Sequence, residues 1–197
     1  MSHAMNDDGT GGEFVESVSV EGPTAFEAAE SAPGRGMNLV AIVAAVLALD
    51  LVTKLWIQRS LRLYEQIEVI GDYLRLTYIY NPGAAFGINV GEYSRIVFLV
   101  LSLVALVALV AMYWTTPRSD RLRLYSIALI CGGALGNLID RVRSPRGVVD
   151  FLDVGIGAMR WPVFNVADMA VTVGAVLLAL SLWSEDSRPR EDGGKRS

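Results

Sequence analysis

Four long apolar runs constrain the fold of this chain more than any other feature of its sequence. They cover roughly residues 38–57, 96–114, 125–139 and 166–183. A helix needs about 17–25 mostly apolar residues to cross the hydrocarbon core of a bilayer, and the third run approaches this length once residues 122–124 are included. We therefore expect an α-helical polytopic membrane protein with four transmembrane helices, at 38–57, 96–114, 122–140 and 165–183.

The two ends of the chain differ in composition from this apolar region. Residues 1–36 are rich in Gly, Glu, Ala and Ser, so we expect a disordered tail, and residues 185–197 form a second polar tail. Nothing in the first segment resembles a signal peptide, because acidic residues stand where a basic segment would be. The membrane domain is expected to occupy residues 37–184.

Charge and residue counts exclude several classes of protein. The formal net charge of −4 argues against nucleic-acid binding. The only histidine, His3, lies in the first tail, which excludes a Ser-His-Asp triad, a Cys-His nucleophile and a His-rich zinc site. The only cysteine is Cys131, so no intramolecular disulfide can form. We expect neither a metal nor a cofactor.

A short region between the first two runs has the character of β-strands. Residues 73–80 are rich in aromatic and β-branched residues, and Gly71 and Asp72 mark a turn before them. This predicts a small β-sheet over residues 64–80, which must lie at the membrane surface because open sheet edges are not tolerated in lipid. The next residues, 81–87, read Asn-Pro-Gly-Ala-Ala-Phe-Gly and leave room for close backbone approach to a ligand, although a tight turn explains them as well.

Nearly all polar residues of the apolar region map to one membrane face. With four spans, the end of the first helix, the start of the second, the end of the third and the start of the fourth share that face, and a loop between the last two carries Asp150. Asp50 and Lys54 lie four residues apart on the first helix, in the order that favours an ion pair. Ionisable groups at such depth are costly in lipid and are therefore candidates for function. The converging residues are Asp50, Lys54, Asn81, Asn137, Asp140, Arg141, Asp150, Asn165 and Asp168.

Two of these aspartates suit general acid–base chemistry. A pair of carboxyl groups that shares one proton can activate a water molecule and polarise an amide carbonyl. Asp140 is followed directly by Arg141, which suits charge compensation, and Asp50 has Lys54. Asp150 and Asp168 have no basic neighbour close in sequence, so local reasoning favours these two as the pair.

Four blocks of the sequence resemble the signature blocks of lipoprotein signal peptidase, also called signal peptidase II. The blocks lie at residues 81–87, 136–141, 149–151 and 164–168, in the family's order and with matching spacing, and Asp50 and Lys54 match the pair on the family's first helix. The resemblance covers residues 37–184. It implies an aspartic endopeptidase of the bacterial inner membrane that removes the signal peptide from a diacylglyceryl-modified prolipoprotein, cutting just before the lipidated cysteine.

The resemblance also assigns roles to residues. It implies that Asp150 and Asp168 form the catalytic dyad near the periplasmic face, that residues 64–80 form a periplasmic surface sheet, and that both termini are cytoplasmic. Besides the prolipoprotein we expect membrane lipid as a partner, no nucleic acid, and a monomer. The residues that would bind substrate or support the site are Asn81, Gly83, Ala84, Ala85, Phe86, Asn137, Asp140, Arg141, Asn165, Asp50 and Lys54.

The charge pattern gives independent but weak support for this orientation. The short loop between the second and third helices carries Arg118, Arg121 and Arg123, and the positive-inside rule places such a loop in the cytoplasm. With these three arginines included, the two predicted sides carry equal numbers of basic residues, so only their density in the short loop indicates the orientation.

Three other functions fit parts of the sequence. Intramembrane Asp and Arg residues also serve as proton relays in transporters, although the chain shows no internal repeat. A serine–lysine peptidase would use Lys54 as base with Ser60 or Ser94 as nucleophile, without any supporting motif. A non-catalytic membrane scaffold would leave the clustered carboxylates unexplained.

Overall fold

The protein is described by a computed structural model that covers residues 35–83 and 91–186. Most of the two predicted tails, together with Ala84, Ala85 and Phe86, lies outside the described residues. The elements are, in chain order, α2 (Arg35–Ser60), β1 (Gln66–Ile70), β2 (Leu74–Asn81), the 3₁₀ turn η1 (Gly91–Tyr93), α3 (Ser94–Thr115), α4 (Arg121–Arg143), β3 (Val148–Ile156), β4 (Met159–Arg160) and α5 (Val166–Asp186).

Helices α2, α3, α4 and α5 are long and apolar enough to cross a membrane, which confirms the predicted fold class of four transmembrane helices with a small antiparallel sheet. Their ends follow from local chemistry. The Asp120 carboxylate caps α4 by accepting a hydrogen bond from the backbone N–H of Arg123 at 3.0 Å. Pro145 follows the other end of α4, and a proline disfavours helical backbone in the residue before it.

Helix α4 lies at the centre of the helix bundle because three glycines let its neighbours approach closely. A side chain at Gly132 would meet Val46 on α2, and one at Gly133 would overlap the backbone carbonyl oxygen of Ala167 on α5. A side chain at Gly136 would overlap the carboxylate of Asp50 on α2. Small residues at helix contacts are a general means of association in lipid, and here they bring α2 and α5 against the polar end of α4.

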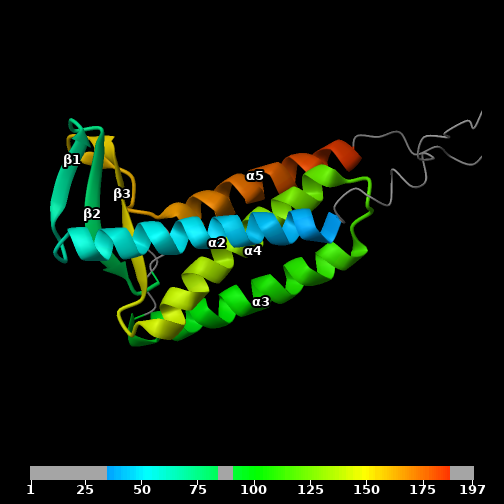
Figure 1. The fold of residues 1–197 in the computed structure, drawn as a ribbon, viewed down its shortest axis with the longest axis horizontal. Coiled ribbons are helices and arrows are strands. Elements are labelled where there is room, and N and C mark those ends of the chain that lie inside the picture. The colour runs from blue at the N-terminus through cyan, green and yellow to red at the C-terminus, as the bar shows by residue number, and fades with distance from the viewer. Residues whose placement is uncertain (1–34, 84–90, 187–197) are drawn as a thin grey trace, which may run out of the picture. The chain divides into compact units, whose positions relative to one another are not determined.

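The sheet has four antiparallel strands in the order β1-β2-β3-β4 and lies at one end of the helices (Figure 1). The C-terminal end of α2 packs on it: Ile57, together with Leu61 just beyond the helix, contacts Tyr78 of β2 and Val149 and Phe151 of β3. The end of α2, the start of α3, the end of α4 and the start of α5 all lie at this same end of the molecule, as the four-span topology predicts (Figure 1).

One prediction about this region is wrong. Residues 148–151, expected in a loop, belong to strand β3, and Asp150 pairs with Ile79 of β2. The physical reason is burial on both faces of the strand, since residues 148–151 are all buried. The segment therefore lacks the alternation of apolar and polar residues that marks a strand with one solvated face.

Candidate active site

Asp150 and Asp168 are both held by asparagine amides. Asp150 projects from β3 and is 1% exposed; its Oδ1 accepts a hydrogen bond from Asn165 Nδ2 at 2.7 Å and its Oδ2 accepts one from Asn81 Nδ2 at 2.9 Å. Asp168 lies in the first turn of α5, and its Oδ1 accepts a hydrogen bond from Asn137 Nδ2 at 2.8 Å. Three asparagines that come from β2, α4 and the start of α5 thus converge on two carboxyl groups.

Asn165 links the two aspartates because it caps α5. Its Oδ1 accepts a hydrogen bond from the backbone N–H of Asp168 at 2.9 Å, and its own backbone N–H donates to Asp168 Oδ2 at 3.2 Å. This reciprocal arrangement satisfies two backbone N–H groups at the helix start. The same Asn165 side chain is fully buried and donates to Asp150, so the cap of α5 and the side chain of β3 are fixed by one residue.

Burial and a neighbouring charge change the acidity of Asp150. Removal from water disfavours the ionised carboxylate, the negative charge of Asp168 disfavours it further, and together they raise the pKa of Asp150 to about 7. The amides of Asn81 and Asn165 act in the opposite direction with smaller effect. At neutral pH this group can therefore be present with or without its proton.

The other two aspartates both form ion pairs with Lys54. Lys54 Nζ lies 2.8 Å from Asp50 Oδ2, 2.8 Å from Asp140 Oδ2 and 3.0 Å from Asn137 Oδ1. An ammonium group has three N–H donors, so these partners use all of them. Asp50 Oδ1 also accepts a hydrogen bond from the backbone N–H of Ala167 at 3.0 Å, which ties α2 directly to the first turn of α5.

Asp140 and Arg141, which are adjacent in the sequence, form no direct ion pair among the described residues. Consecutive residues point in different directions on a helix, so Asp140 turns towards Lys54 on α2 while Arg141 turns towards α3. Arg141 donates from Nη1 to the carbonyl oxygen of Asn137 at 3.2 Å, and its guanidinium carbon lies 6.0 Å from the centre of the Phe98 ring. Within the described part of the chain, its buried Nε has no hydrogen-bond partner.

The structure therefore brings together most of the residues that the sequence singled out. The described ones that share direct hydrogen bonds or ion pairs are Asp50, Lys54, Asn81, Asn137, Asp140, Asp150, Asn165 and Asp168. Gly83 lies beside them: its N–H donates to Asn81 Oδ1 at 3.0 Å, and its φ of 124° suits only glycine. Ala84, Ala85 and Phe86 lie outside the described residues.

Two contributors to the site were not among the site residues that sequence reasoning predicted. Ala167 contributes its backbone N–H to Asp50, and no side-chain pattern can signal such a contact. Gly136 makes room for the Asp50 carboxylate. The sequence indicates that this small residue suits close helix packing, but it does not show which residue of another helix Gly136 faces.

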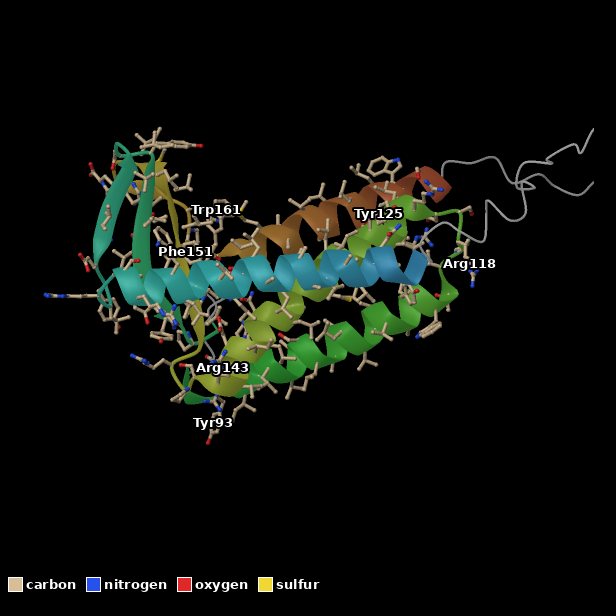
Figure 2. All side chains as sticks on the ribbon, viewed as in Figure 1. Tyr93, Arg118, Tyr125, Arg143, Phe151 and Trp161 are labelled. Atoms are coloured by element: carbon tan, nitrogen blue, oxygen red, sulfur yellow. The ribbon has the colours of Figure 1, made fainter. Side chains whose placement is uncertain are left out.

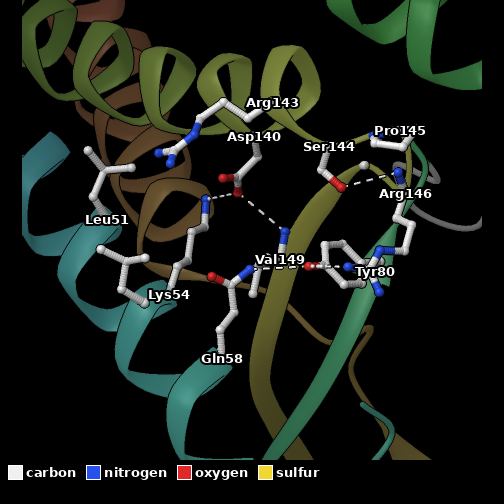
Figure 3. Close-up of a pocket in the computed structure, with 12 residues that line it drawn as sticks. Leu51, Lys54, Gln58, Tyr80, Asp140, Arg143, Ser144, Pro145, Arg146 and Val149 are labelled. Atoms are coloured by element: carbon white, nitrogen blue, oxygen red, sulfur yellow. Dashed lines mark hydrogen bonds and ion pairs between the residues drawn. The ribbon is translucent and has the colours of Figure 1, made fainter. Parts of the chain in front are cut away.

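A cavity of about 350 Å³ lies beside this network, between α2, the end of α4 and the start of β3 (Figure 3). Lys54 and Asp140 line it, whereas Asp150 and Asp168 do not. Among residues 35–83 and 91–186, no three His, Cys, Asp or Glu side chains are grouped so that they could hold a metal ion.

Comparison with known proteins identifies the family. The sequence profile of the family described as Signal peptidase (SPase) II matches residues 42–184. The lipoprotein signal peptidase of Geobacter metallireducens is 42% identical over 157 residues, which cover 79% of this chain and 96% of that protein. The corresponding protein of Halothermothrix orenii is 45% identical and covers 74% of this chain and 94% of its own length.

Solved structures agree with the sequence comparison. A bacterial membrane enzyme determined at 2.3 Å resolution superposes with a TM-score of 0.70 at 33% identity, covering 78% of this chain and 92% of that one. A second, at 1.9 Å resolution, superposes with a TM-score of 0.66 at 35% identity and covers 74% and 92%. Because the family profile spans most of the chain and the relatives align over nearly their full length, the chain belongs to the signal peptidase II family of aspartic membrane peptidases.

Proposed function

We propose that the chain removes signal peptides from diacylglyceryl-modified prolipoproteins, cutting before the lipidated cysteine, and that Asp150 and Asp168 carry out the hydrolysis. The observation that carries the catalytic assignment is the contrast between the four aspartates. Lys54 forms ion pairs with Asp50 and Asp140, whereas Asp150 and Asp168 accept only from amides and form no ion pair among the described residues. General acid–base catalysis needs carboxyl groups that can gain and lose a proton, and a carboxyl group without an ion-pair partner, such as Asp150 or Asp168, suits this role.

The two carboxyl groups divide the proton transfer between them. The first turn of α5 favours an anion at Asp168, and burial favours a proton on Asp150. Asp168 takes a proton from water as the water oxygen bonds to the scissile carbonyl carbon, and Asp150 gives its proton to the carbonyl oxygen. When the C–N bond breaks, Asp168 gives its proton to the leaving amine and the hydroxyl proton returns to Asp150. Both carboxyls end as they began.

The substrate assignment is supported by the family and by the position of the site. Relatives at more than 40% identity are named lipoprotein signal peptidases. The polar cluster comes from α2, the end of α4, the start of α5 and strands β2 and β3, and these elements meet where the helices adjoin the sheet (Figure 1). A lipid-anchored substrate can reach such a site from within the bilayer, whereas transfer of its acyl chains through water would cost about 0.8 kcal/mol per CH₂.

The orientation in the membrane belongs to the same proposal. The short connection between α3 and α4 carries Arg118, Arg121 and Arg123, and short loops rich in Arg favour the cytoplasm. Both termini would then be cytoplasmic, in the bacterial inner membrane, and the sheet with the candidate site would lie at the periplasmic face.

The test is a cleavage assay of the purified chain on a lipidated prolipoprotein. Asp150→Asn and Asp168→Asn should each reduce the rate by about 10²–10⁴-fold, because Asn keeps the shape of Asp but cannot carry the proton. The matched control is Asp120→Asn at the opposite end of α4, since Asn caps a helix as well as Asp does. Thermal unfolding of every variant would show that the fold is retained.

Two outcomes would contradict the proposal. A loss of less than about tenfold in both dyad variants would remove these residues from catalysis, and inactive Ser60→Ala or Ser94→Ala with active Asp150→Asn would support the serine–lysine mechanism instead. Equal cleavage of substrates with a lipidated and an unmodified cysteine would show that lipid has no part in recognition.

A further inference from the structure

The cavity beside Lys54 has one apolar side and one polar side. Leu51 and Leu55, four residues apart on α2, form the apolar side, and Leu55 is 41% exposed. Arg143 at the end of α4 and Arg146 before β3 form the polar side (Figure 3). The leucines lie within the membrane span Asn38–Ser60, and the arginines lie at and beyond the end of the span Arg121–Arg143. The cavity therefore crosses the level at which hydrocarbon gives way to head groups.

The charges on the cavity wall do not balance. Lys54 and Asp140 also line it, and Lys54 forms ion pairs at 2.8 Å with both Asp140 and the buried Asp50. Neither Arg143 nor Arg146 has a carboxylate within ion-pair distance in the described residues, so both guanidinium groups lack a paired anion. Planar guanidinium groups present paired N–H donors that match the oxygens of a phosphate.

Contacts with Tyr80 fix the position of the Arg146 guanidinium at the cavity. Its guanidinium carbon lies 4.1 Å from the centre of the Tyr80 ring, and its Nη2 donates to the Tyr80 hydroxyl at 3.2 Å. Gln58 Nε2 donates to the same hydroxyl at 3.2 Å. Figure 3 shows Arg143 and Arg146 on opposite sides of the cavity, so that an anion between them would contact side chains from two separate segments.

We propose that this cavity binds the head group of an anionic phospholipid. The arginines would hold the phosphate, and an acyl chain would lie along Leu51 and Leu55. A soluble anion would satisfy the arginines but leave the exposed leucine side uncovered, and a neutral lipid would leave the charges uncompensated. An anionic amphiphile at the membrane surface fits both sides.

This site is separate from the candidate dyad but adjoins it through the backbone. Gly147 and Val149 line the cavity, and Asp150 follows Val149 on β3. A lipid held between Arg143 and Arg146 would span the connection between α4 and β3. It should therefore stabilise the fold at this end of the molecule, whether or not Asp150 acts in catalysis.

The test is thermal unfolding and native mass spectrometry of the full chain in detergent. Phosphatidylglycerol should raise the Tm saturably and bind at least about tenfold more tightly than phosphatidylcholine with the same acyl chains, a difference of about 1.4 kcal/mol. Glycerol 3-phosphate at the same concentration should produce no shift. These three ligands distinguish binding of an anionic phospholipid from binding of a phospholipid without net charge and from binding of a soluble phosphate ester.

Two variants locate the binding. The Arg143 side chain has no charged partner in the described structure, and Arg143→Gln should weaken phosphatidylglycerol binding by about tenfold. The double variant Arg143→Gln with Arg146→Gln should bind phosphatidylglycerol no more tightly than phosphatidylcholine. The matched control, Arg59→Gln with Arg62→Gln, loses the same charge at the same end of the molecule but outside this cavity. It should bind like the unaltered chain.

Each contrary result would overturn the proposal. Equal binding of phosphatidylglycerol and phosphatidylcholine would indicate non-specific contact with lipid. A shift with glycerol 3-phosphate equal to that with phosphatidylglycerol would indicate a simple anion site. Equal losses in the Arg59/Arg62 control and the Arg143/Arg146 variant would indicate general surface electrostatics, and unchanged binding in the latter variant would exclude this cavity.

Discussion

Helices α3 and α4 have nearly the same length, 22 and 23 residues, but opposite roles. Only 6% of the most apolar stretch of α3 is buried within the protein, against 44% for α4. The less apolar helix is thus the centre of the fold, and the more apolar one is left uncovered by the rest of the described protein over most of its length (Figure 2). Hydropathy drives insertion into the bilayer, whereas small residues and polar contacts decide which helices pack together once they are inserted.

The largest expected effect comes from the buried ion cluster that α4 shares with α2. Lys54→Met should destabilise the folded chain by about 3–5 kcal/mol, because the fully buried Asp50 and the partly buried Asp140 would both lose their cation. The measurement is the free energy of unfolding in detergent. On α3, Ser102→Ala removes a hydroxyl that bonds only its own helix, to the Phe98 carbonyl oxygen at 2.7 Å, and should change stability by less than about 0.5 kcal/mol.

A cost below about 1 kcal/mol for Lys54→Met would mean that the carboxylates find protons or water instead. If the variant fails to fold at all, a chain with Asp50→Leu and Asp140→Leu added should recover folding. Recovery would assign the defect to uncompensated charge and not to the lost lysine side chain.

The next effect is a pH dependence of stability at the polar end of the molecule. Burial and Asp168 raise the pKa of Asp150 from 3.8 to about 7, so between these values the folded protein keeps a proton that the unfolded chain releases. Stability should therefore fall as pH rises through this interval and level off above it. At about 1.4 kcal/mol per unit of pKa, the loss is at most about 4 kcal/mol.

Asp150→Asn should flatten this part of the curve of Tm against pH. The substitution also alters a hydrogen bond with Asn81 or Asn165, which changes Tm at every pH. The slope of the curve, and not the value of Tm, is therefore the quantity to compare. Parallel curves for Asp150→Asn and the unaltered chain would show that Asp150 ionises at its ordinary pKa in the folded state.

A third effect tests why α4 is central. Gly133→Val should cost about 1–3 kcal/mol or more, because the new side chain would overlap the carbonyl oxygen of Ala167 and would crowd Val171 on α5. Ala105→Val, which adds two carbons where Gly133→Val adds three, lies at an exposed position of α3 and should be tolerated within about 0.5 kcal/mol. Similar costs in the two helices would mean that close contact between α4 and α5 contributes little to the fold.

The comparison also explains what the sequence could predict. Four spans follow from hydropathy alone, and the convergence of polar residues at one face follows from four spans. The central place of α4 in the bundle does not follow from hydropathy, because it depends on which residues of the other helices face Gly132, Gly133 and Gly136. Strand β3 was missed because burial on both faces removes the alternation by which strands are recognised.

The candidate site was predictable in its membership but not in its pairings. Sequence spacing predicted the contact between Asp50 and Lys54 on one helix turn, and the structure has it at 2.8 Å. It missed the contact of Lys54 with Asp140, because these residues come from different helices. Local reasoning reaches about one helix turn, whereas the contacts that distinguish the four aspartates are tertiary.

The smallest expected effect compares the same chemical change in both helices. Ile127 on α4 is 3% exposed and Ile96 on α3 is 55% exposed. Ile127→Val should cost about 0.5–1.5 kcal/mol, because the deleted methylene leaves a gap between packed side chains. Ile96→Val should change stability by no more than about 0.5 kcal/mol, because lipid chains adapt to the smaller side chain and are as apolar as the residue they contact. The measurement is the free energy of unfolding of both variants in the same detergent. A greater loss of stability from Ile96→Val than from Ile127→Val would show that α3 makes packing contacts that its exposed surface does not indicate.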